Sequence, residues 1–369
     1  MGLNKIRLGD YIIRSTQNNR DLKYGVELIS GVTSQGIFAI PKGEPIDVNL
    51  KPYKIVNNGA FVYNPTRLNL GSIAYRTDGL CIVSHLYMVF YLTEEGKRII
   101  DPTWLYIYFR RNEFLREVTF RNFGSQRPEF NFEDMSDIVI PLPDLQTQQK
   151  YVDIYNAMVA NQQAYERGLE DLKVALDAQI DKIKHSAPRM RVGNILDEVD
   201  NRNSEGVIKN VQGINISKQF MPSVADINGV DLRKYKVVQK GQLAVSGMQT
   251  GRDECIRIAL HDTEQPIIIS PAYTVFEVKE KTVIPEYVMI WFSRNESDRR
   301  GWFVSDSSIR SNLDLERFYE IQIPIPDKKL QEAAVTFYEV YITRKKINEQ
   351  LKTQIKNICP ILIRGSLEE

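Results

Sequence analysis

Two patterns of hydrophobic and polar residues alternate along the chain. Runs of β-branched and aromatic residues, broken by Gly, Asn and Pro, are followed by long stretches in which hydrophobic residues recur every three or four positions. The first pattern is typical of strands and turns in a mixed α/β globule, and the second is typical of an amphipathic helix. The best strand candidates are Val83 to Leu92 and Pro266 to Val278.

The first long helix is predicted from Leu145 to Lys184, a stretch with no proline and a single glycine. Asp144 suits the N-cap position of this helix, and Pro188 marks its stop. At about 1.5 Å per residue the helix spans roughly 60 Å. One small domain cannot cover a helix of that length, so its hydrophobic stripe needs a further partner.

A second long helix is predicted from Leu330 to Ile358, before Pro360. We expect the hydrophobic stripes of the two helices to pair as an antiparallel, intramolecular coiled coil. The alternatives are that each helix packs on its own globule, or that a second copy of the chain completes the coiled coil. The residues predicted to pair are Leu169, Leu172, Leu176 and Ile180 with Ile347, Leu351 and Ile355.

The order of globule and helix occurs twice, and such internal repeats are sought before local structure is interpreted. Ile-Pro-Leu-Pro-Asp ends the first globule at Asp144, and Ile-Pro-Ile-Pro-Asp ends the second at Asp327, 183 positions later. Three further matched blocks keep their order: 109–113 with 292–296, 82–90 with 268–276, and 53–56 with 235–238. The sequence therefore predicts two similar α/β globules related by a pseudo-twofold axis.

These patterns divide the chain into four parts. Residues 1–143 and 188–326 form the globules, and residues 144–187 and 327–369 form the helices that join them. A length of 369 residues fits two domains of ordinary size. No stretch of 18 apolar residues is present and the N-terminus does not resemble a signal peptide, so we expect a cytoplasmic protein that does not bind membranes.

Charge and cysteine usage limit the possible chemistry. The formal net charge is +1, which argues against a protein that coats nucleic acid through an excess of basic residues. DNA binding would have to come from a local surface. Cys81, Cys255 and Cys359 are far apart and fit reduced thiols. No cysteine or histidine cluster has zinc spacing, so no bound metal is expected.

The repeated order resembles the specificity subunit of type I restriction-modification systems over nearly the whole chain. Residues 124–131, followed by Ile140-Pro141-Leu142-Pro143 and Gln148, are similar to the junction that closes a target-recognition domain of that family. Gln331 matches Gln148, although the second junction, at residues 305–310, lacks the Gly and Gln of the first.

This resemblance implies that each globule is a target-recognition domain that reads one half of a bipartite target in double-stranded DNA. It also implies that the long helices act as spacers and bind two modification subunits, which methylate adenine with S-adenosylmethionine. Restriction subunits would add cleavage of DNA with ATP and Mg. This chain is then expected to bind no cofactor itself.

The sequence contains no recognisable catalytic motif. Amino-methyltransferases of this kind carry Asn/Asp-Pro-Pro-Tyr/Phe, and the nearest strings, at residues 64–67 and 101–104, lack the second proline. No Gly-x-x-x-x-Gly-Lys-Ser/Thr phosphate loop is present. We therefore expect a non-catalytic specificity subunit. A protein-binding scaffold with two recognition domains is the alternative, and an enzyme with an unrecognised site is a weaker one.

Basic and amide side chains are the candidates for DNA contact, since such groups bind base edges and phosphates. The densest basic stretch runs from Arg110 to Arg127. A solvated or carboxylate-paired side chain is the competing interpretation for each candidate. Steep salt dependence of DNA binding would separate a DNA reader from a scaffold. The residues predicted to contact DNA are Arg121, Arg127, Arg310, Lys218, Gln219 and Arg252.

Overall fold

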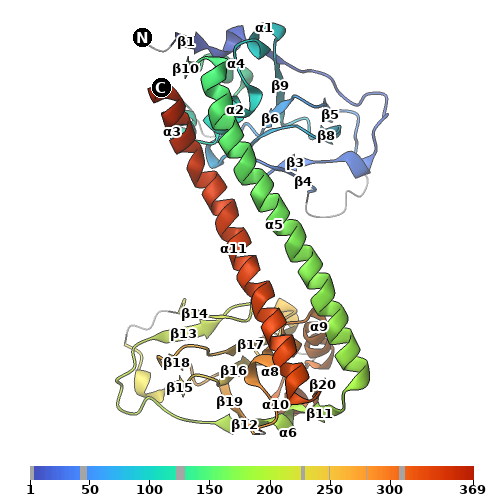
Figure 1. Ribbon diagram of the computed structural model, residues 1–369, viewed down its shortest axis with the longest axis vertical. Helices are drawn as coiled ribbons and strands as arrows, with labels where there is room; N and C mark the ends of the chain where they lie inside the picture. Colours follow the sequence, from blue (N-terminus) through green and yellow to red (C-terminus); the bar gives the residue numbers. More distant parts are fainter. Residues whose placement is uncertain are drawn as a thin grey trace. The chain divides into compact units, whose positions relative to one another are not determined.

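The computed structural model describes residues 4–41, 48–121, 129–225, 229–248, 250–279, 281–306 and 312–369. The chain divides into two units. The first unit comprises Met1–Glu166 and Lys346–Glu369, and the second comprises Arg167–Lys345. Each unit therefore contains one globule and a stretch of each long helix (Figure 1). None of the described helices is both long enough and apolar enough to cross a membrane.

The first globule is built on a four-stranded antiparallel sheet. Its strand order is β2 (Ile12–Arg14), β9 (Met88–Leu92), β6 (Phe61–Tyr63) and β7 (Ile73–Tyr75). The paired strands beside it are β1 (Asn4–Arg7) with β10 (Val139–Leu142), β5 (Lys54–Val56) with β8 (Cys81–Val83), and β3 (Gly31–Val32) with β4 (Phe38–Ala39). Its helices are α1 (Glu94–Lys97), α2 (Pro102–Phe109), α3 (Asn112–Arg121) and α4 (Phe132–Ser136), with 3-10 turns η1 (Leu8–Asp10), η2 (Val26–Leu28) and η3 (Leu68–Leu70).

The second globule repeats this plan. Its four-stranded antiparallel sheet has the order β12 (Leu196–Val199), β19 (Thr274–Val278), β16 (Leu243–Ser246) and β17 (Arg257–Leu260). Strand β11 (Arg189–Arg191) pairs with β20 (Gln322–Pro324), and a second sheet has the order β14 (Phe220–Pro222), β13 (Val211–Ile214), β18 (Ile267–Ile269) and β15 (Lys236–Val238). Its helices are α6 (Val192–Ile195), α7 (Thr250–Asp253), α8 (Pro285–Phe292), α9 (Asn295–Val304) and α10 (Leu315–Glu320), with the 3-10 turn η4 (Leu232–Lys234).

The two main sheets confirm the predicted repeat. In both sheets the first strand along the chain pairs with the fourth, the fourth with the second, and the second with the third. The interpretation of the best strand candidates needs correction. Each candidate is two strands separated by a turn, and the two strands join different sheets. The turns are closed by hydrogen bonds from Tyr87 N to Ser84 O and from Tyr273 N to Ser270 O. The turns span Ser84 to Tyr87 and Ser270 to Tyr273, and Ser270-Pro271 is a turn signal within an otherwise strand-like composition.

The first long helix, α5 (Leu145–Ser186), begins where the sequence predicts. The side chain of Asp144 accepts a hydrogen bond from Thr147 N at 2.8 Å, which confirms Asp144 as the N-cap. This hydrogen bond, with others from the Thr147 side chain and the Gln146 backbone, lowers the pKa of the Asp144 carboxyl. The helix ends two residues before Pro188, as predicted.

The second long helix, α11 (Lys328–Glu368), does not stop at Pro360. The predicted end was therefore wrong. Proline removes one helical hydrogen bond and strains the preceding turn, at a cost of about 3 kcal/mol. Packing beyond the proline offsets this cost, since Leu362 and Ile363 are buried in the first core. In addition, Trp104 Nε1 donates to Ser366 Oγ at 3.0 Å.

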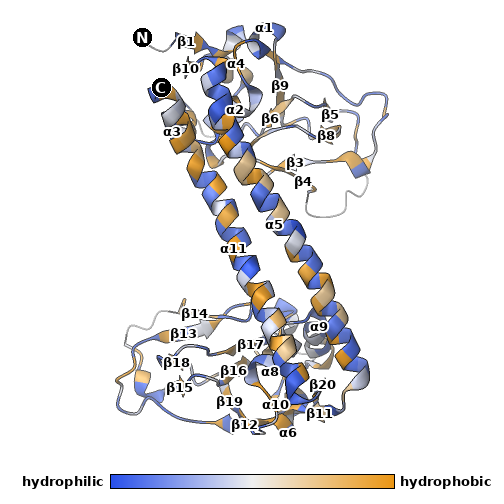
Figure 2. Ribbon diagram, in the orientation of Figure 1, coloured by the Kyte–Doolittle hydropathy of each residue, from blue (hydrophilic) through white to orange (hydrophobic). Residues whose placement is uncertain are grey.

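Within each unit a stretch of α5 packs against a stretch of α11. In the first unit Gln162 Nε2 donates to Asn348 Oδ1 at 3.0 Å, and Lys352 Nζ lies 2.6 Å from Glu166 Oε1. Hydrogen bonds from Lys352 and Gln162 lower the pKa of Glu166. Hydrophilic and hydrophobic residues are interspersed along both helices (Figure 2). An amphipathic helix places its hydrophobic residues on one face, at spacings of three and four.

The predicted partners of Leu176 and Ile180 were wrong. These two residues are buried in the core of the second unit together with Ala334, near the start of α11. The three residues predicted to meet them, Ile347, Leu351 and Ile355, belong to the first unit. Leu169 and Leu172 are half-buried residues of the second unit. Sequence periodicity identifies a stripe, but it does not determine which part of another stripe lies opposite.

Candidate nucleic-acid interface

The basic stretch of the first globule begins with two arginines that hold the fold together. Arg110 is buried, and its guanidinium donates to Gly71 O at 2.5 Å and to Ser34 O at 3.3 Å. Arg111 lies over the ring of Tyr108, with 3.7 Å between the guanidinium carbon and the ring centroid. The Arg110 guanidinium is therefore occupied within the fold, and Arg111 is half-buried against Tyr108.

Helix α3 presents its remaining arginines to solvent. Arg116 is 76% exposed and lies 3.4 Å from Glu113, and Arg121 lies 2.9 Å from Glu117. Exposed pairs of this kind contribute little to stability and exchange readily for another anion. Arg121 therefore occupies a position from which it can bind phosphate, and its role stays a prediction.

The matched helix α9 of the second globule has a similar surface. Arg299 and Arg300 are exposed, and Arg300 lies 5.8 Å from the ring centroid of Phe303. Phe303 is 80% exposed, and Phe120, the residue 183 positions earlier on α3, is 82% exposed. Arg127 and Arg310, the two arginines predicted to contact DNA from matched positions, lie outside the described residues.

The prediction for Lys218 was wrong. Its side chain is only 7% exposed, and its ammonium lies 2.5 Å from Asp298 Oδ1 and also donates to Phe292 O. A cation held this way is not available to phosphate or bases. The neighbouring Gln219 lies in the turn that joins β13 to β14, and its side chain is exposed. Its DNA contact stays a prediction.

Arg252 is accessible in the structure. It lies on the short helix α7, which begins at the buried residue Thr250. The Arg252 side chain is 61% exposed and lies 2.9 Å from Asp253. Burial tends to raise the pKa of Asp253, but hydrogen bonds from Arg252 and Arg257 hold it below its usual value.

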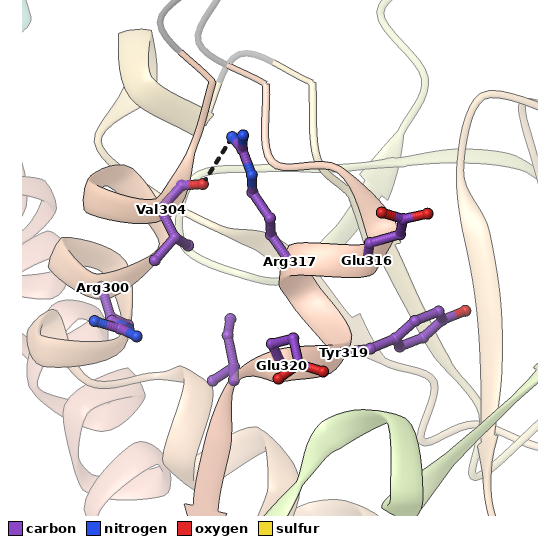
Figure 3. Close-up of a pocket in the computed structure, with 7 residues that line it drawn as sticks. Arg300, Val304, Glu316, Arg317, Tyr319 and Glu320 are labelled. Atoms are coloured by element: carbon purple, nitrogen blue, oxygen red, sulfur yellow. Dashed lines mark hydrogen bonds between the residues drawn. The ribbon is translucent and has the colours of Figure 1, made fainter.

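A pocket of about 570 Å³ lies in the second unit beside α10. Arg317 reaches from α10 to the carbonyl oxygen of Val304 at 3.1 Å (Figure 3), and its guanidinium lies 3.3 Å from Asp314. Glu320 pairs with Arg191 at 3.0 Å. Arg317 and Glu320 thus have protein partners, and Arg300, Glu316 and Tyr319 also line the pocket. Among the described residues, no group of three or more His, Cys, Asp and Glu could hold a metal ion.

Two matched glutamines join each long helix to its globule. Gln148 Oε1 accepts from Asp101 N at 2.7 Å, and its Nε2 donates to Ile99 O and Pro143 O, both at 2.8 Å. Gln331 Oε1 accepts from Ile284 N at 3.0 Å, and its Nε2 donates to Thr282 O and Pro326 O, both at 2.9 Å. Both glutamines are fully buried. The repeat therefore extends to the hydrogen bonds that orient globule and helix.

The family model of the type I restriction modification DNA specificity domain matches residues 9–172 and 224–357. These two segments cover more than half of the chain, and each includes a large part of one globule and part of the adjoining long helix. The chain belongs to this family. It is therefore a DNA-sequence-recognition protein of type I restriction-modification systems.

Two solved structures of this class have a similar fold. The S subunit of a type I restriction-modification system from M. genitalium has a TM-score of 0.59 at 13% identity, with 99% of this chain and 96% of that chain covered. A chain from a structure describing assembly and conformational transition of the type I R-M system has a TM-score of 0.52 at 13% identity, with 99% and 97% covered. No curated protein sequence matches the chain.

In this specificity subunit, sequence reasoning found the repeat, the glutamines of the junctions and three accessible candidates, Arg121, Gln219 and Arg252. It missed the hairpin β3–β4 of the first globule, whose short strands hold only two residues each. A usable signal was the match of Gly31 and Phe38 to Gly213 and Phe220, which lies outside the four blocks on which the repeat was recognised.

Proposed function

We propose that this specificity subunit reads a bipartite target in double-stranded DNA, with one half-site for each globule, and directs adenine methylation by two partner modification subunits. The observation that carries the proposal is the duplication of one recognition fold on two long helices. Two similar reading heads are suited to two half-sites separated by base pairs that neither head reads. The length of α5 and α11 would then set the number of unread base pairs.

The chain's own residues support a role in recognition without catalysis. Its exposed arginines and amides are groups that bind phosphates and base edges. We assign S-adenosylmethionine to the modification subunits, and ATP with Mg to restriction subunits that join the complex. The exposed residues of the two globules differ while the sheets agree, so the two half-sites should be unequal in sequence.

Single-molecule sequencing of genomic DNA tests this function directly. Cells would express the cognate modification subunit with and without this chain. We expect a methyladenine motif of two short half-sites around a fixed spacer, and only when the chain is present. If the complex forms but no such motif appears, the chain does not read DNA for methylation and the protein-binding scaffold becomes the better interpretation.

Salt dependence offers a second test. Specific DNA binding should weaken steeply between 50 and 200 mM salt, because each phosphate contact releases counterions. Binding to a protein partner through a mostly uncharged surface would change little over the same range. A flat response together with no preference among DNA sequences would contradict the proposal.

A further inference from the structure

Each globule carries one β-hairpin of the same geometry. In β3–β4, Thr33 N donates to Ile37 O and Gly36 N donates to Thr33 O, both at 3.0 Å. In β13–β14, Asn215 N donates to Gln219 O and Lys218 N donates to Asn215 O, both at 3.1 Å. Both tips are thus five-residue turns with the same two backbone hydrogen bonds.

The fourth residue of each turn has a left-handed backbone. Gly36 has φ of 78°, which costs glycine nothing, whereas Lys218 has φ of 61°. A left-handed lysine is strained by about 1–3 kcal/mol and persists only where its surroundings hold it. The buried contacts of Lys218 with Asp298 and Phe292 O supply that constraint. The same tip shape is therefore maintained even where the sequence opposes it.

Buried groups fix the first hairpin to its globule. Ser72 Oγ donates to Val32 O at 2.8 Å, and Tyr87 Oη accepts from Val32 N at 3.2 Å. Arg110 donates to Ser34 O, and Tyr106 Oη donates to Gly36 O at 3.1 Å. These contacts leave the tip little freedom to move relative to α2.

The hairpins are also linked to the long helices by matched tyrosines. In the first unit Tyr106, which holds Gly36, packs against Tyr155 of α5 with ring centroids 6.3 Å apart. In the second unit Tyr338 Oη of α11 donates to Ser293 Oγ at 3.0 Å, next to the Phe292 carbonyl that Lys218 binds. Tyr155 and Tyr338 are 183 positions apart. The tip of the first hairpin is thereby positioned relative to α5, and the tip of the second relative to α11.

The tips combine uniform shape with different side chains. Ser34, Gln35 and Ile37 are exposed in the first hairpin, whereas the second exposes a different set. That set is Ile216, Ser217 and Gln219. No aspartate or glutamate occurs from Leu28 to Pro41 or from Gly206 to Ala225, so neither hairpin repels a phosphate backbone.

From this geometry we propose that the two hairpin tips enter the DNA groove and determine the base sequence of the two half-sites. The proposal rests on the proposed function. A two-stranded β-ribbon fits the major groove of B-DNA, glutamine binds adenine through two hydrogen bonds, and an aliphatic side chain contacts the thymine methyl. Gln35 with Ile37 and Gln219 with Ile216 supply these groups, and the rigid anchoring places them reproducibly.

The test uses the full complex of this chain with its modification subunits, and compares Gln35→Ala with Gln219→Ala. We would determine the methylated motif and then measure Kd for duplexes with each base pair of the motif replaced in turn. Each variant should lose roughly 5- to 150-fold of its discrimination at a base pair of one half-site. The other half-site and the spacer should be unchanged, and the two variants should affect opposite half-sites.

Gln17→Ala and Gln239→Ala are the matched controls, since both residues are exposed glutamines outside the hairpins. They should leave discrimination at both half-sites intact. The inference is overturned if wild type produces a bipartite motif while both hairpin variants retain wild-type discrimination at every position. If wild type produces no bipartite motif, the proposed function itself fails and the hairpin inference fails with it. The unaffected half-site shows that each variant complex is folded.

Discussion

In the first unit the cation that anchors the hairpin lies at the end of α2 and reaches the turn, whereas in the second unit the cation lies in the turn and reaches the end of α8. Arg110 donates to backbone carbonyl oxygens, and Lys218 binds a carbonyl oxygen and the carboxylate of Asp298. The hairpin is thus joined to the helix by a cation in both units, but the helix end supplies the cation in the first unit and the hairpin supplies it in the second. What the repeat preserves is the position of the hairpin and not the residue that holds it.

A second pair of lysines differs in its surroundings. Lys54 of β5 donates to Tyr87 O at 2.5 Å, and its pKa is lowered by burial and by the nearby charge of Arg14. Lys236 of β15 instead lies 3.8 Å from Glu198 and 3.7 Å from Asp200. The strand is kept in both units, but the local charge reverses. The repeated fold therefore tolerates opposite local charge at the same strand position.

The largest expected effect concerns a feature that the two units share, the buried glutamine. Gln148→Ala and Gln331→Ala should each lower the free energy of unfolding by about 3–6 kcal/mol, because each leaves one buried and two partly buried backbone groups unpaired. Urea denaturation would measure it. Gln149→Ala is the adjacent control, since Gln149 is exposed and its side chain hydrogen-bonds the exposed Asp153 of the same helix. A loss below 1 kcal/mol in either unit would show that the hydrogen bonds do not secure that junction.

The two hairpin anchors should respond unequally to loss of their charge. Lys218→Met leaves the largely buried Asp298 carboxylate without its cation and should cost about 3–5 kcal/mol. Arg110→Met leaves only carbonyl oxygens unpaired and should cost about 2 kcal/mol. Unfolding measurements on both variants, and on Lys218→Met combined with Asp298→Asn, would test this. The second substitution should restore part of the stability lost in the first, and equal costs at both anchors would remove the contrast.

Alkaline pH should weaken the first core more than the second at one matched position. Burial raises the pKa of Cys359 to about 11 from the ordinary thiol value of 9.0, whereas the residue 183 positions earlier is Leu176. Between these values the unfolded chain releases the thiol proton and the folded chain keeps it. Stability therefore falls as pH rises, by at most about 1.4 kcal/mol per pH unit from this thiol.

The check is the pH dependence of unfolding for wild type and Cys359→Val from pH 8 to 11. Buried tyrosines and the other two cysteines contribute to both proteins, so only the difference reports on Cys359. The variant should show the shallower decline. Parallel curves would mean that the thiol titrates alike in the folded and unfolded chains.

The smallest effects are expected at the exposed arginines. Arg121→Ala in the first unit and Arg252→Ala in the second should weaken DNA binding about equally for all sequences, and should each reduce the slope of log Kd against log salt by about 0.9. Lys97→Ala is a control, since Lys97 is an exposed residue paired with Glu94. A change in base preference without a change in slope would assign the arginine to base reading.

Much of the architecture could be predicted because its signals are local. The absence of proline after Asp144, the spacing of hydrophobic residues and the recurrence of Ile-Pro-x-Pro-Asp identified both long helices and the repeat. Of the candidate site residues, Arg121, Gln219 and Arg252 are accessible in the structure. Lys218 carried the same residue-type signal, yet it is buried against Asp298, which lies 80 positions away.

The sequence by itself determined that two similar α/β globules alternate with two amphipathic helices, because periodicity, capping and repetition are written within short segments. Only the tertiary structure decided how far α11 continues past Pro360, which part of α11 covers Leu176, and whether a lysine faces solvent or a buried carboxylate. Each of those outcomes depends on residues distant in the chain. Contacts between such distant residues are determined by tertiary packing, and a local sequence pattern does not predict them.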